Sequence, residues 1–259
     1  MKILCSLLIA LFCILPQCKS STAEQDRDIL FQTSTINALL EGVFEGNVTY
    51  KELKQHGDFG LGTFNNLNGE MIALNNNFYQ IKADGKVYPV ADSQITPFAV
   101  VTFFDQDSSI SVKGNLNYDE LKQHIDKHLP TENIFYAIKI EGSFQYVKAR
   151  SVPQQKKPYP EIMEIIKVQP IFEFEEIKGT MVGFRLPTYM NGINVPGYHL
   201  HFITEDKTAG GHVLDCKLKD VTIEIDFTTR SYLNLPEVKD FYSANLTKKE
   251  KVDINKVEK

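Results

Sequence analysis

Short runs of alternating apolar and polar residues, separated by turn residues, constrain the fold of this chain more than any other feature. Between residues 60 and 104 the runs are rich in β-forming side chains, and the dipeptides Asn68-Gly69 and Asp84-Gly85 predict hairpins. The β pattern resumes at Phe135. In the C-terminal half, alternation predicts five strands, over residues 171–176, 180–186, 198–204, 212–218 and 221–227. Such a chain is expected to fold into mostly antiparallel sheets.

Helical patterns are few and short. They predict four helices, over about residues 36–46, 49–57, 117–128 and 161–168. Thr49 and Asn117 are suited to cap the second and the third of these helices. The sequence therefore predicts an α+β fold with two mixed, largely antiparallel β-sheets and short flanking helices.

A proline-rich stretch is the most linker-like part of the chain after its first residues. Residues 151–160 contain Pro153, Pro158 and Pro160 among lysines and glutamines. We therefore expect an N-terminal α/β sheet domain over residues 24–152. A C-terminal sheet domain, with a charged tail, is expected over residues 153–259.

The composition excludes two broad classes of protein. Hydrophobic residues make up 42% of the 259 residues, which is enough to bury a sizeable core and is far from the composition of a disordered chain. The formal net charge is −5. A general nucleic-acid binder needs a basic surface that attracts phosphates over a distance, so we expect no nucleic-acid partner.

The first 23 residues have the pattern of a signal peptide. Lys2 precedes an apolar run over residues 3–16, which is too short to cross a bilayer comfortably, and small residues allow cleavage after Ala23. We therefore expect export to the periplasm or the extracellular space. Alternatively, Cys18 could be the lipidated cysteine of a lipoprotein. Unless Cys18 is lipidated, no membrane association is expected.

Cleavage after Ala23 would remove three of the four cysteines. Cys216 would remain as a lone thiol, and no internal disulfide would then be possible. The fold would depend on its apolar core, with the help of a metal ion or a partner subunit.

Three of the six histidines lie close together in the C-terminal half. His199 and His201 are two residues apart, so on a β-strand they project from one face while Tyr198, Leu200 and Phe202 project from the other. One face of this strand is therefore predicted to join the core and the other to carry a polar site.

A hairpin would bring the third histidine to the same place. His201 and His212 are symmetric about position 206.5, so a turn near Asp206 places His212 opposite or diagonal to the pair. Three converging imidazoles suit Zn²⁺ or a similar divalent ion, with coordination positions left for water or substrate. We therefore predict a metal site on strands of the C-terminal half, with His199, His201 and His212 as ligands.

Other interpretations of this cluster stay open at this point. Cys216 is four residues beyond His212 and shares its strand parity, so a closed structural Cys/His zinc site is possible. The imidazoles could also fill a polar sheet face without metal. A cupin site would use two histidines with Glu205, but a cupin needs a further histidine after His212, and none follows.

The remaining histidines are weaker candidates. His124 and His128 are four residues apart on a predicted helix, but Ile125 stands where a zincin helix requires glutamate, so we favour a surface position. His56 lies alone at a predicted helix end, and we assign it no functional role.

Several separate motifs resemble the α-acetolactate decarboxylase family over essentially the whole chain after the leader. They are Gly62-Thr63-Phe64, Leu67-Asn68-Gly69-Glu70-Met71, Phe78-Tyr79-Gln80-Ile81, Asp84-Gly85, Phe135-Tyr136-Ala137-Ile138, Arg150-Ser151-Val152-Pro153, Gly179-Thr180-Met181-Val182-Gly183-Phe184 and Gly197-Tyr198-His199-Leu200-His201-Phe202. Such motifs in the correct order are far more specific than a histidine pair alone.

The resemblance implies a carboxy-lyase of acetoin biosynthesis that converts (S)-2-acetolactate into (R)-acetoin and CO₂. It implies zinc held by the three histidines, no organic cofactor and a homodimer. It also implies catalytic roles for Glu70, Arg150 and Glu258, the last from a C-terminal tail that folds back onto the site.

Two functions compete with this expectation. One is a cupin-like metal enzyme, such as a dioxygenase or an isomerase, which would depend on iron and consume oxygen. The other is a secreted binding module in which zinc braces a hairpin. Neither explains the family motifs in the first half of the chain.

Overall fold

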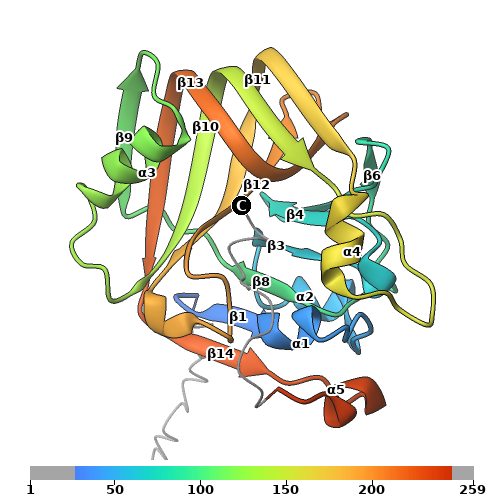
Figure 1. The fold of residues 1–259 in the computed structure, drawn as a ribbon. Helices are drawn as coiled ribbons and strands as arrows, with labels where there is room; N and C mark the ends of the chain where they lie inside the picture. The colour runs from blue at the N-terminus through green and yellow to red at the C-terminus, as the bar shows by residue number, and fades with distance from the viewer. Residues whose placement is uncertain (1–26, 247–259) are drawn as a thin grey trace, which may run out of the picture.

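Two β-sheets packed against each other form most of the structure (Figure 1). The computed structural model describes residues 27–246 of the 259-residue chain. The predicted leader over residues 1–23, with Cys18, and the predicted catalytic residue Glu258 lie outside the described residues. Within residues 27–246, no helix is both long enough and apolar enough to cross a membrane.

The larger sheet has seven strands and is mixed. Its edge strand β14 runs parallel to β1, while the other neighbours are antiparallel. In order across the sheet, the strands are β14 (Ser231–Asn234), β1 (Leu30–Thr33), β8 (Ala99–Thr102), β3 (Phe59–Thr63), β4 (Glu70–Leu74), β5 (Asn77–Ile81) and β6 (Val87–Pro89). A separate ribbon pairs β2 (Val48–Thr49) with β7 (Ile95–Thr96).

The second sheet has five antiparallel strands, three of them long and strongly curved (Figure 1). The strands are β9 (Ser108–Lys113), β10 (Phe135–Arg150), β11 (Ile171–Leu186), β12 (Gly197–Thr204) and β13 (Gly210–Thr228). Strand β10 pairs with both β11 and β13, and β12 joins β11 to β13, so these four strands close on one another. The prediction of two largely antiparallel sheets with short flanking helices is confirmed, although only the larger sheet is mixed.

The helices are short and lie around the sheets. They are α1 (Ile36–Leu40), α2 (Tyr50–Leu53), α3 (Tyr118–Asp126), α4 (Ile162–Lys167) and α5 (Lys239–Ser243), with 3-10 turns η1 (Asn65–Leu67) and η2 (Thr188–Met190). The predicted caps are confirmed, because Thr49 accepts a hydrogen bond from the Glu52 amide and Asn117 forms a capping box with Glu120. Helix α1 ends earlier than predicted, because Gly42 adopts a left-handed φ of +86°.

The strands of the five-stranded sheet are longer than the sequence predicts. Residues 171–176 and 180–186 form one strand, β11, and residues 212–218 and 221–227 form one strand, β13. Strand β10 pairs with both β11 and β13 along nearly its whole length. Its backbone hydrogen bonds continue past the positions where the alternation of apolar and polar residues is interrupted. Irregularities in the β10–β13 register, such as the one at Ser143, absorb the mismatch.

Both predicted turn dipeptides lie in hairpin connections. Asp84-Gly85 lies between the paired strands β5 and β6. Asn68-Gly69 lies between the paired strands β3 and β4, in a connection that also includes η1. The tightest turn is Asn75-Asn76, where φ values of +52° and +63° close the β4–β5 hairpin. The sequence patterns considered above do not predict that turn.

Two apolar cores lie on the two faces of the five-stranded sheet. One fills the space between the sheets and includes Leu61 and Ile72 from the larger sheet and Val182 and Phe184 from β11. The other core lies on the opposite face of the five-stranded sheet and takes Leu200 and Phe202 from β12, with many side chains of β10 and β13. The side chains of β12 that alternate with these two, which include His199 and His201, therefore face the larger sheet.

Strand pairing crosses the predicted domain boundary in both sheets. Strands β9 and β10, from the segment 24–152, pair with β11 and β13 from the segment 153–259. Strand β14 pairs in turn with β1. The division at residues 152 and 153 stays a prediction about folding units.

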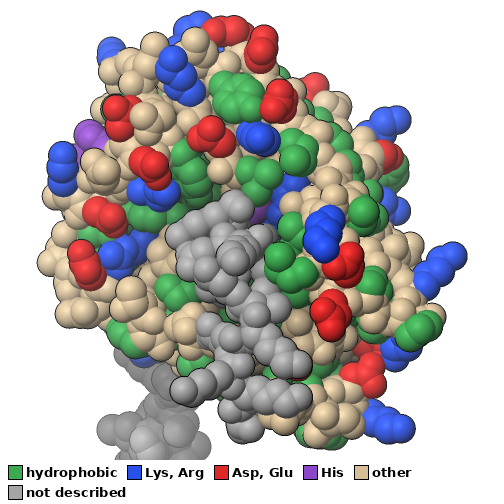
Figure 2. All heavy atoms as spheres, in the orientation of Figure 1, with side chains coloured by type: hydrophobic (Ala, Val, Ile, Leu, Met, Phe, Trp, Pro, Cys, Tyr) green, Lys and Arg blue, Asp and Glu red, His purple; other side chains and the backbone are tan. Residues whose placement is uncertain are grey.

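On the face that Figure 2 draws, lysine and arginine side chains are interspersed with aspartate and glutamate among the described residues.

We predict that Asp226 makes the stability of the fold depend on pH. This carboxyl on β13 is 5% exposed, and burial raises its pKa to about 7, assisted by neighbouring carboxylates including Asp107. Asp226 holds its proton more tightly in the folded chain than in the unfolded chain. The contribution of Asp226 to the free energy of unfolding therefore falls as pH rises from about 4 to about 7.

Asp226→Asn keeps an acceptor for the Asp105 amide but cannot ionise. It should therefore unfold at higher urea than the wild type above about pH 7 and at a similar concentration below about pH 4. Asp220→Asn, at an exposed position of the same strand, is the matched control. An Asp226→Asn protein with the wild-type pH profile would contradict this assignment.

Candidate metal centre and active site

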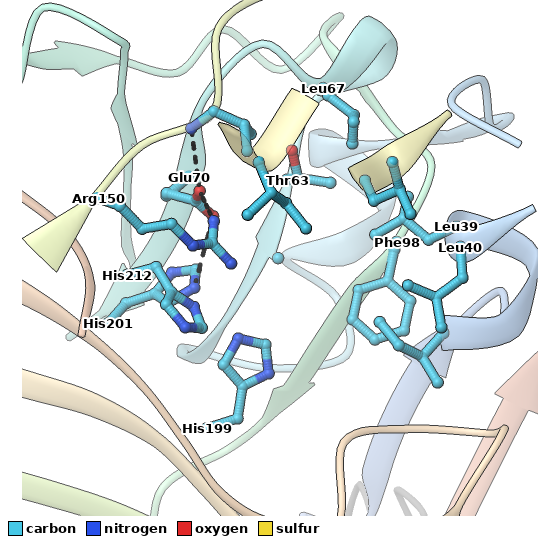
Figure 3. Close-up of a pocket in the computed structure, with 15 residues that line it drawn as sticks. Leu39, Leu40, Thr63, Leu67, Glu70, Phe98, Arg150, His199, His201 and His212 are labelled. Atoms are coloured by element: carbon cyan, nitrogen blue, oxygen red, sulfur yellow. Dashed lines mark hydrogen bonds and ion pairs between the residues drawn. The ribbon is translucent and has the colours of Figure 1, made fainter. Parts of the chain in front are cut away.

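Three imidazoles from two neighbouring strands meet in a pocket between the sheets (Figure 3). His199 and His201 project from one face of β12, and His212 on β13 is the direct partner of His201. The predicted hairpin register is therefore confirmed. One ring nitrogen of each residue lies within 4.8 Å of those of the other two, and all three residues are buried.

The neighbouring strand holds the β12 backbone at close range. Gly183 on β11 pairs with Leu200 on β12, the residue after His199. A Cβ atom at residue 183 would lie 1.9 Å from the His199 carbonyl oxygen. A larger residue at this position would push β12 away from β11. The turn after β12 is held by Thr204, whose hydroxyl donates to Asp206 at 2.6 Å. These contacts fix the position of the imidazoles through the backbone that carries them.

Hydrogen bonding fixes the tautomer of His201. Its Nδ1 lies 2.8 Å from the Met71 carbonyl oxygen, which can only accept, so Nδ1 carries the proton and Nε2 carries a lone pair. The Nε2 atom is buried and makes no hydrogen bond to the described residues. A histidine whose second nitrogen donates to a carbonyl is the usual arrangement of a metal ligand.

Burial keeps two of the imidazoles neutral. It lowers the pKa of His199 to about 3, with a further contribution from the Arg150 cation. Burial also lowers the pKa of His201 well below its usual range, assisted by His199. Neutral imidazoles are the form that binds metal. The donor set, its burial and its spacing therefore fit a divalent transition-metal ion.

Cys216 does not belong to this donor set. Its strand parity predicts the same face as His212, but Lys148 pairs with Asp215 while Ala149 pairs with Val213, so Leu214 is an extra residue in β13. This bulge reverses the alternation and places Cys216 in the apolar core on the opposite face of the sheet. Burial there raises the pKa of the thiol to about 12.

Glu205, the possible cupin ligand, is also outside the donor set. It is exposed in the turn between β12 and β13. Among the described residues, the three imidazoles are the one group of three or more potential ligands close enough to hold a metal ion.

A buried ion pair lies beside the imidazoles. Arg150, the last residue of β10, places Nη1 2.8 Å from Oε1 of Glu70, the first residue of β4, and the two side chains are about equally buried. The Val152 amide donates to the same oxygen at 3.3 Å. Oε2 of Glu70 lies 3.6 Å from Nε2 of His201. The structure thus brings the predicted residues Glu70 and Arg150 into the pocket of the three histidines.

The rest of the pocket wall is mostly apolar, and the sequence patterns do not predict it. The side chains come from α1, η1, the segment before β8, and α4, and they include Leu39, Leu40, Leu67, Phe98, Ile162 and Ile166. Leu39 and Leu40 belong to the predicted apolar stripe of the first helix, but periodicity does not distinguish a core contact from a cavity wall. Thr63 also lines the pocket, and its hydroxyl donates to the Gly69 carbonyl.

The other histidines lie elsewhere. His124 and His128 are on α3 with ring centroids 4.8 Å apart, and Nδ1 of His128 donates to the His124 carbonyl. His128 is exposed, as predicted. The ring of His56 stacks on Phe31 at 3.8 Å.

Comparison with known proteins identifies the family. The family model described as alpha-acetolactate decarboxylase matches residues 30–248, which include every strand and helix described above. The chain belongs to the alpha-acetolactate decarboxylase family. This finding agrees with the resemblance that the sequence motifs indicate.

Relatives within the alpha-acetolactate decarboxylase family match over most of the chain. The alpha-acetolactate decarboxylase of Methanosarcina mazei is 51% identical over 90% of this chain and 81% of the relative. That of Methylococcus capsulatus is 46% identical over 90% of both chains. A crystal structure of alpha-acetolactate decarboxylase from Bacillus subtilis strain 168 superposes with a TM-score of 0.83 at 43% identity, covering 85% of this chain and 94% of that chain.

We predict that His201 is required for metal binding. The purified chain should hold about one equivalent of divalent metal, and His201→Ala should lose most of it, because two imidazoles leave the ion without a third protein ligand. Elemental analysis by mass spectrometry after dialysis measures the metal content. His128→Ala, which removes an exposed imidazole on α3, is the control and should retain the metal. A His201→Ala protein with full metal content would exclude this residue as a ligand.

Proposed function

We propose that this chain is a zinc-dependent decarboxylase that converts (S)-2-acetolactate into (R)-acetoin and CO₂. The observation that carries the proposal is the convergence of His199, His201 and His212 beside the buried pair Glu70 and Arg150. Family membership supports the choice of reaction, since relatives at 51% and 46% identity are alpha-acetolactate decarboxylases.

Decarboxylation requires a group that accepts the two electrons of the broken carbon–carbon bond. When the bond between the carboxyl carbon and C2 of 2-acetolactate breaks, both electrons stay with the organic fragment and move toward the keto oxygen on C3. The carboxyl group leaves as CO₂, and one proton then binds C2. The barrier falls when positive charge or hydrogen-bond donors stand where the oxygen becomes negative.

The three imidazoles supply the means of holding that positive charge. Three neutral nitrogen ligands are typical of catalytic zinc sites, in which a fourth position remains for water or substrate. A bound divalent ion would supply Lewis-acid stabilisation of the charge that develops on the substrate oxygens. His201 is oriented for this task by its hydrogen bond to the Met71 carbonyl.

Glu70 is suited to hold the proton of the substrate hydroxyl group. Its Oε1 is held by Arg150 and the Val152 amide, while Oε2 points toward the ring nitrogen of His201 at 3.6 Å. A substrate hydroxyl near the imidazoles would therefore meet Oε2, and a carboxylate oxygen accepts such a proton.

Arg150 is suited to orient the carboxyl group that leaves. Its guanidinium is planar, carries five N–H donors and matches the geometry of a carboxylate. A guanidinium is a reluctant proton donor, so we assign to Arg150 the positioning of the carboxylate and of the water molecule that delivers the proton to C2. The apolar side chains opposite offer no hydrogen bonds to further water molecules.

We also propose that the enzyme is exported and acts as a homodimer. The leader pattern over residues 1–23 supports export, and the family resemblance supports the pairing of two chains. We further propose a catalytic role for Glu258, which the family resemblance supports.

Removal of the metal should abolish acetoin formation. The purified chain is incubated with racemic 2-acetolactate before and after treatment with a chelator, and acetoin is followed by a colorimetric assay. Activity should fall to background, and added Zn²⁺ should restore it, because the imidazoles alone cannot stabilise the developing negative charge. Activity that survives exhaustive metal removal would overturn the proposed mechanism.

Glu70→Gln should separate catalysis from metal binding. The amide cannot accept the hydroxyl proton, so kcat should fall by roughly 100-fold to 10,000-fold while the metal content stays near that of the wild type. Loss of the counter-ion of Arg150 will also reduce stability, and the unfolding midpoint is therefore measured in parallel.

Glu205→Gln, at an exposed turn position, is the control for this substitution and should keep full activity. A folded Glu70→Gln enzyme with the wild-type rate would remove Glu70 from the catalytic residues.

A further inference from the structure

The pocket is divided into a polar and an apolar side. The imidazoles, Glu70 and Arg150 lie on one side, and Leu39, Leu40 and Phe98 lie across the open space from them (Figure 3). Ile162 and Ile166 of α4 also line the pocket. A ligand that binds here must therefore present its oxygen atoms to one side and its hydrocarbon groups to the other.

A 2-hydroxy-3-keto acid carries both the oxygen atoms and the hydrocarbon groups that such a pocket requires. Its carboxylate, hydroxyl and keto oxygens lie on three consecutive carbons, and its two alkyl groups are attached to C2 and C3. If the oxygens face the imidazoles and Arg150, at least one alkyl group must face the apolar wall. The depth of that wall then limits the length of the alkyl group.

Only some wall residues can set this limit without also holding the fold together. Phe98, Leu67 and Ile162 are almost fully buried members of the apolar cores, so their removal would damage the fold. Leu40 and Ile166 are only partly buried and pack at the edge of a core cluster that includes Phe44 and Ile165, and Leu40 also packs against the core between the sheets. Their side chains combine a cavity contact with a limited structural role.

The two residues stand on short helices that are not part of either sheet. Helices α1 and α4 are five and six residues long and belong to neither sheet, while the polar groups stand on the strands β4, β10, β12 and β13. The apolar wall and the polar side of the pocket are therefore carried by different elements of the chain.

We propose that Leu40 and Ile166 determine which alkyl groups the enzyme accepts on its 2-hydroxy-3-keto acid substrate. This inference rests on the proposed decarboxylase function. In the wild type the two side chains limit the pocket to short alkyl groups, and shortening either of them admits longer ones.

The test compares three substrates that differ only in the alkyl group on C2. They carry methyl, ethyl and propyl groups, and kcat/KM is measured for each with the purified metal-loaded chain. Leu40→Ala and Ile166→Ala should raise the ratio of propyl to methyl kcat/KM by about tenfold or more, which is the usual effect of one or two methylenes in an apolar pocket. Ile166→Phe should lower the same ratio, because its ring extends into the pocket.

Met163→Ala is the matched control. Met163 is also on α4 and packs against the same core cluster, but it does not line the pocket. It should leave the propyl-to-methyl ratio unchanged, even if it lowers the unfolding midpoint as much as Ile166→Ala does.

The outcomes separate this inference from the proposed function. A wild-type chain that forms no acetoin from 2-acetolactate contradicts the proposed function and, with it, the inference. An active wild type whose ratio is the same in Leu40→Ala, Ile166→Ala and Ile166→Phe contradicts the inference alone. If an alanine variant fails to fold, the opposite shift expected for Ile166→Phe still decides the matter.

Discussion

The ion pair between Arg150 and Glu70 joins the two sheets at the point where the pocket forms. Glu70 begins β4 of the larger sheet and Arg150 ends β10 of the smaller sheet, and both are buried beside the apolar core between the sheets. The hydrogen bond from His201 to the Met71 carbonyl crosses the same interface. Buried charges of this kind are costly unless they are paired and hydrogen-bonded, so the packing of the sheets and the geometry of the pocket depend on each other.

The sequence predicts the polar side of the pocket because that side follows local rules. Strand parity places His199 and His201 on one face, and the symmetry of the hairpin brings His212 opposite His201. The same rule fails for Cys216, since the bulge at Leu214 reverses the alternation and leaves no sign in the residue types. Parity is therefore reliable over a few residues and loses its value across an irregularity that only a neighbouring strand reveals.

The apolar side of the pocket could not be predicted in the same way. Leu40 and Ile166 are far apart in the sequence, and they line the same pocket because α1 and α4 pack over the same core cluster. Their sequence patterns are those of ordinary amphipathic helices. The placement of Glu70 beside Arg150 is also a long-range contact, and here the family motifs supply what periodicity does not.

The parallel pairing of β14 with β1 has a consequence for the order in which the chain can fold during its synthesis. Strand β1 is made almost first, but its outer edge is covered only when residues 231–234 emerge, after the whole of the smaller sheet. Until then a chain that emerges N-terminus first exposes an unpaired strand edge, which invites aggregation. Completion of the larger sheet is thus delayed until the strands that carry the imidazoles have been translated.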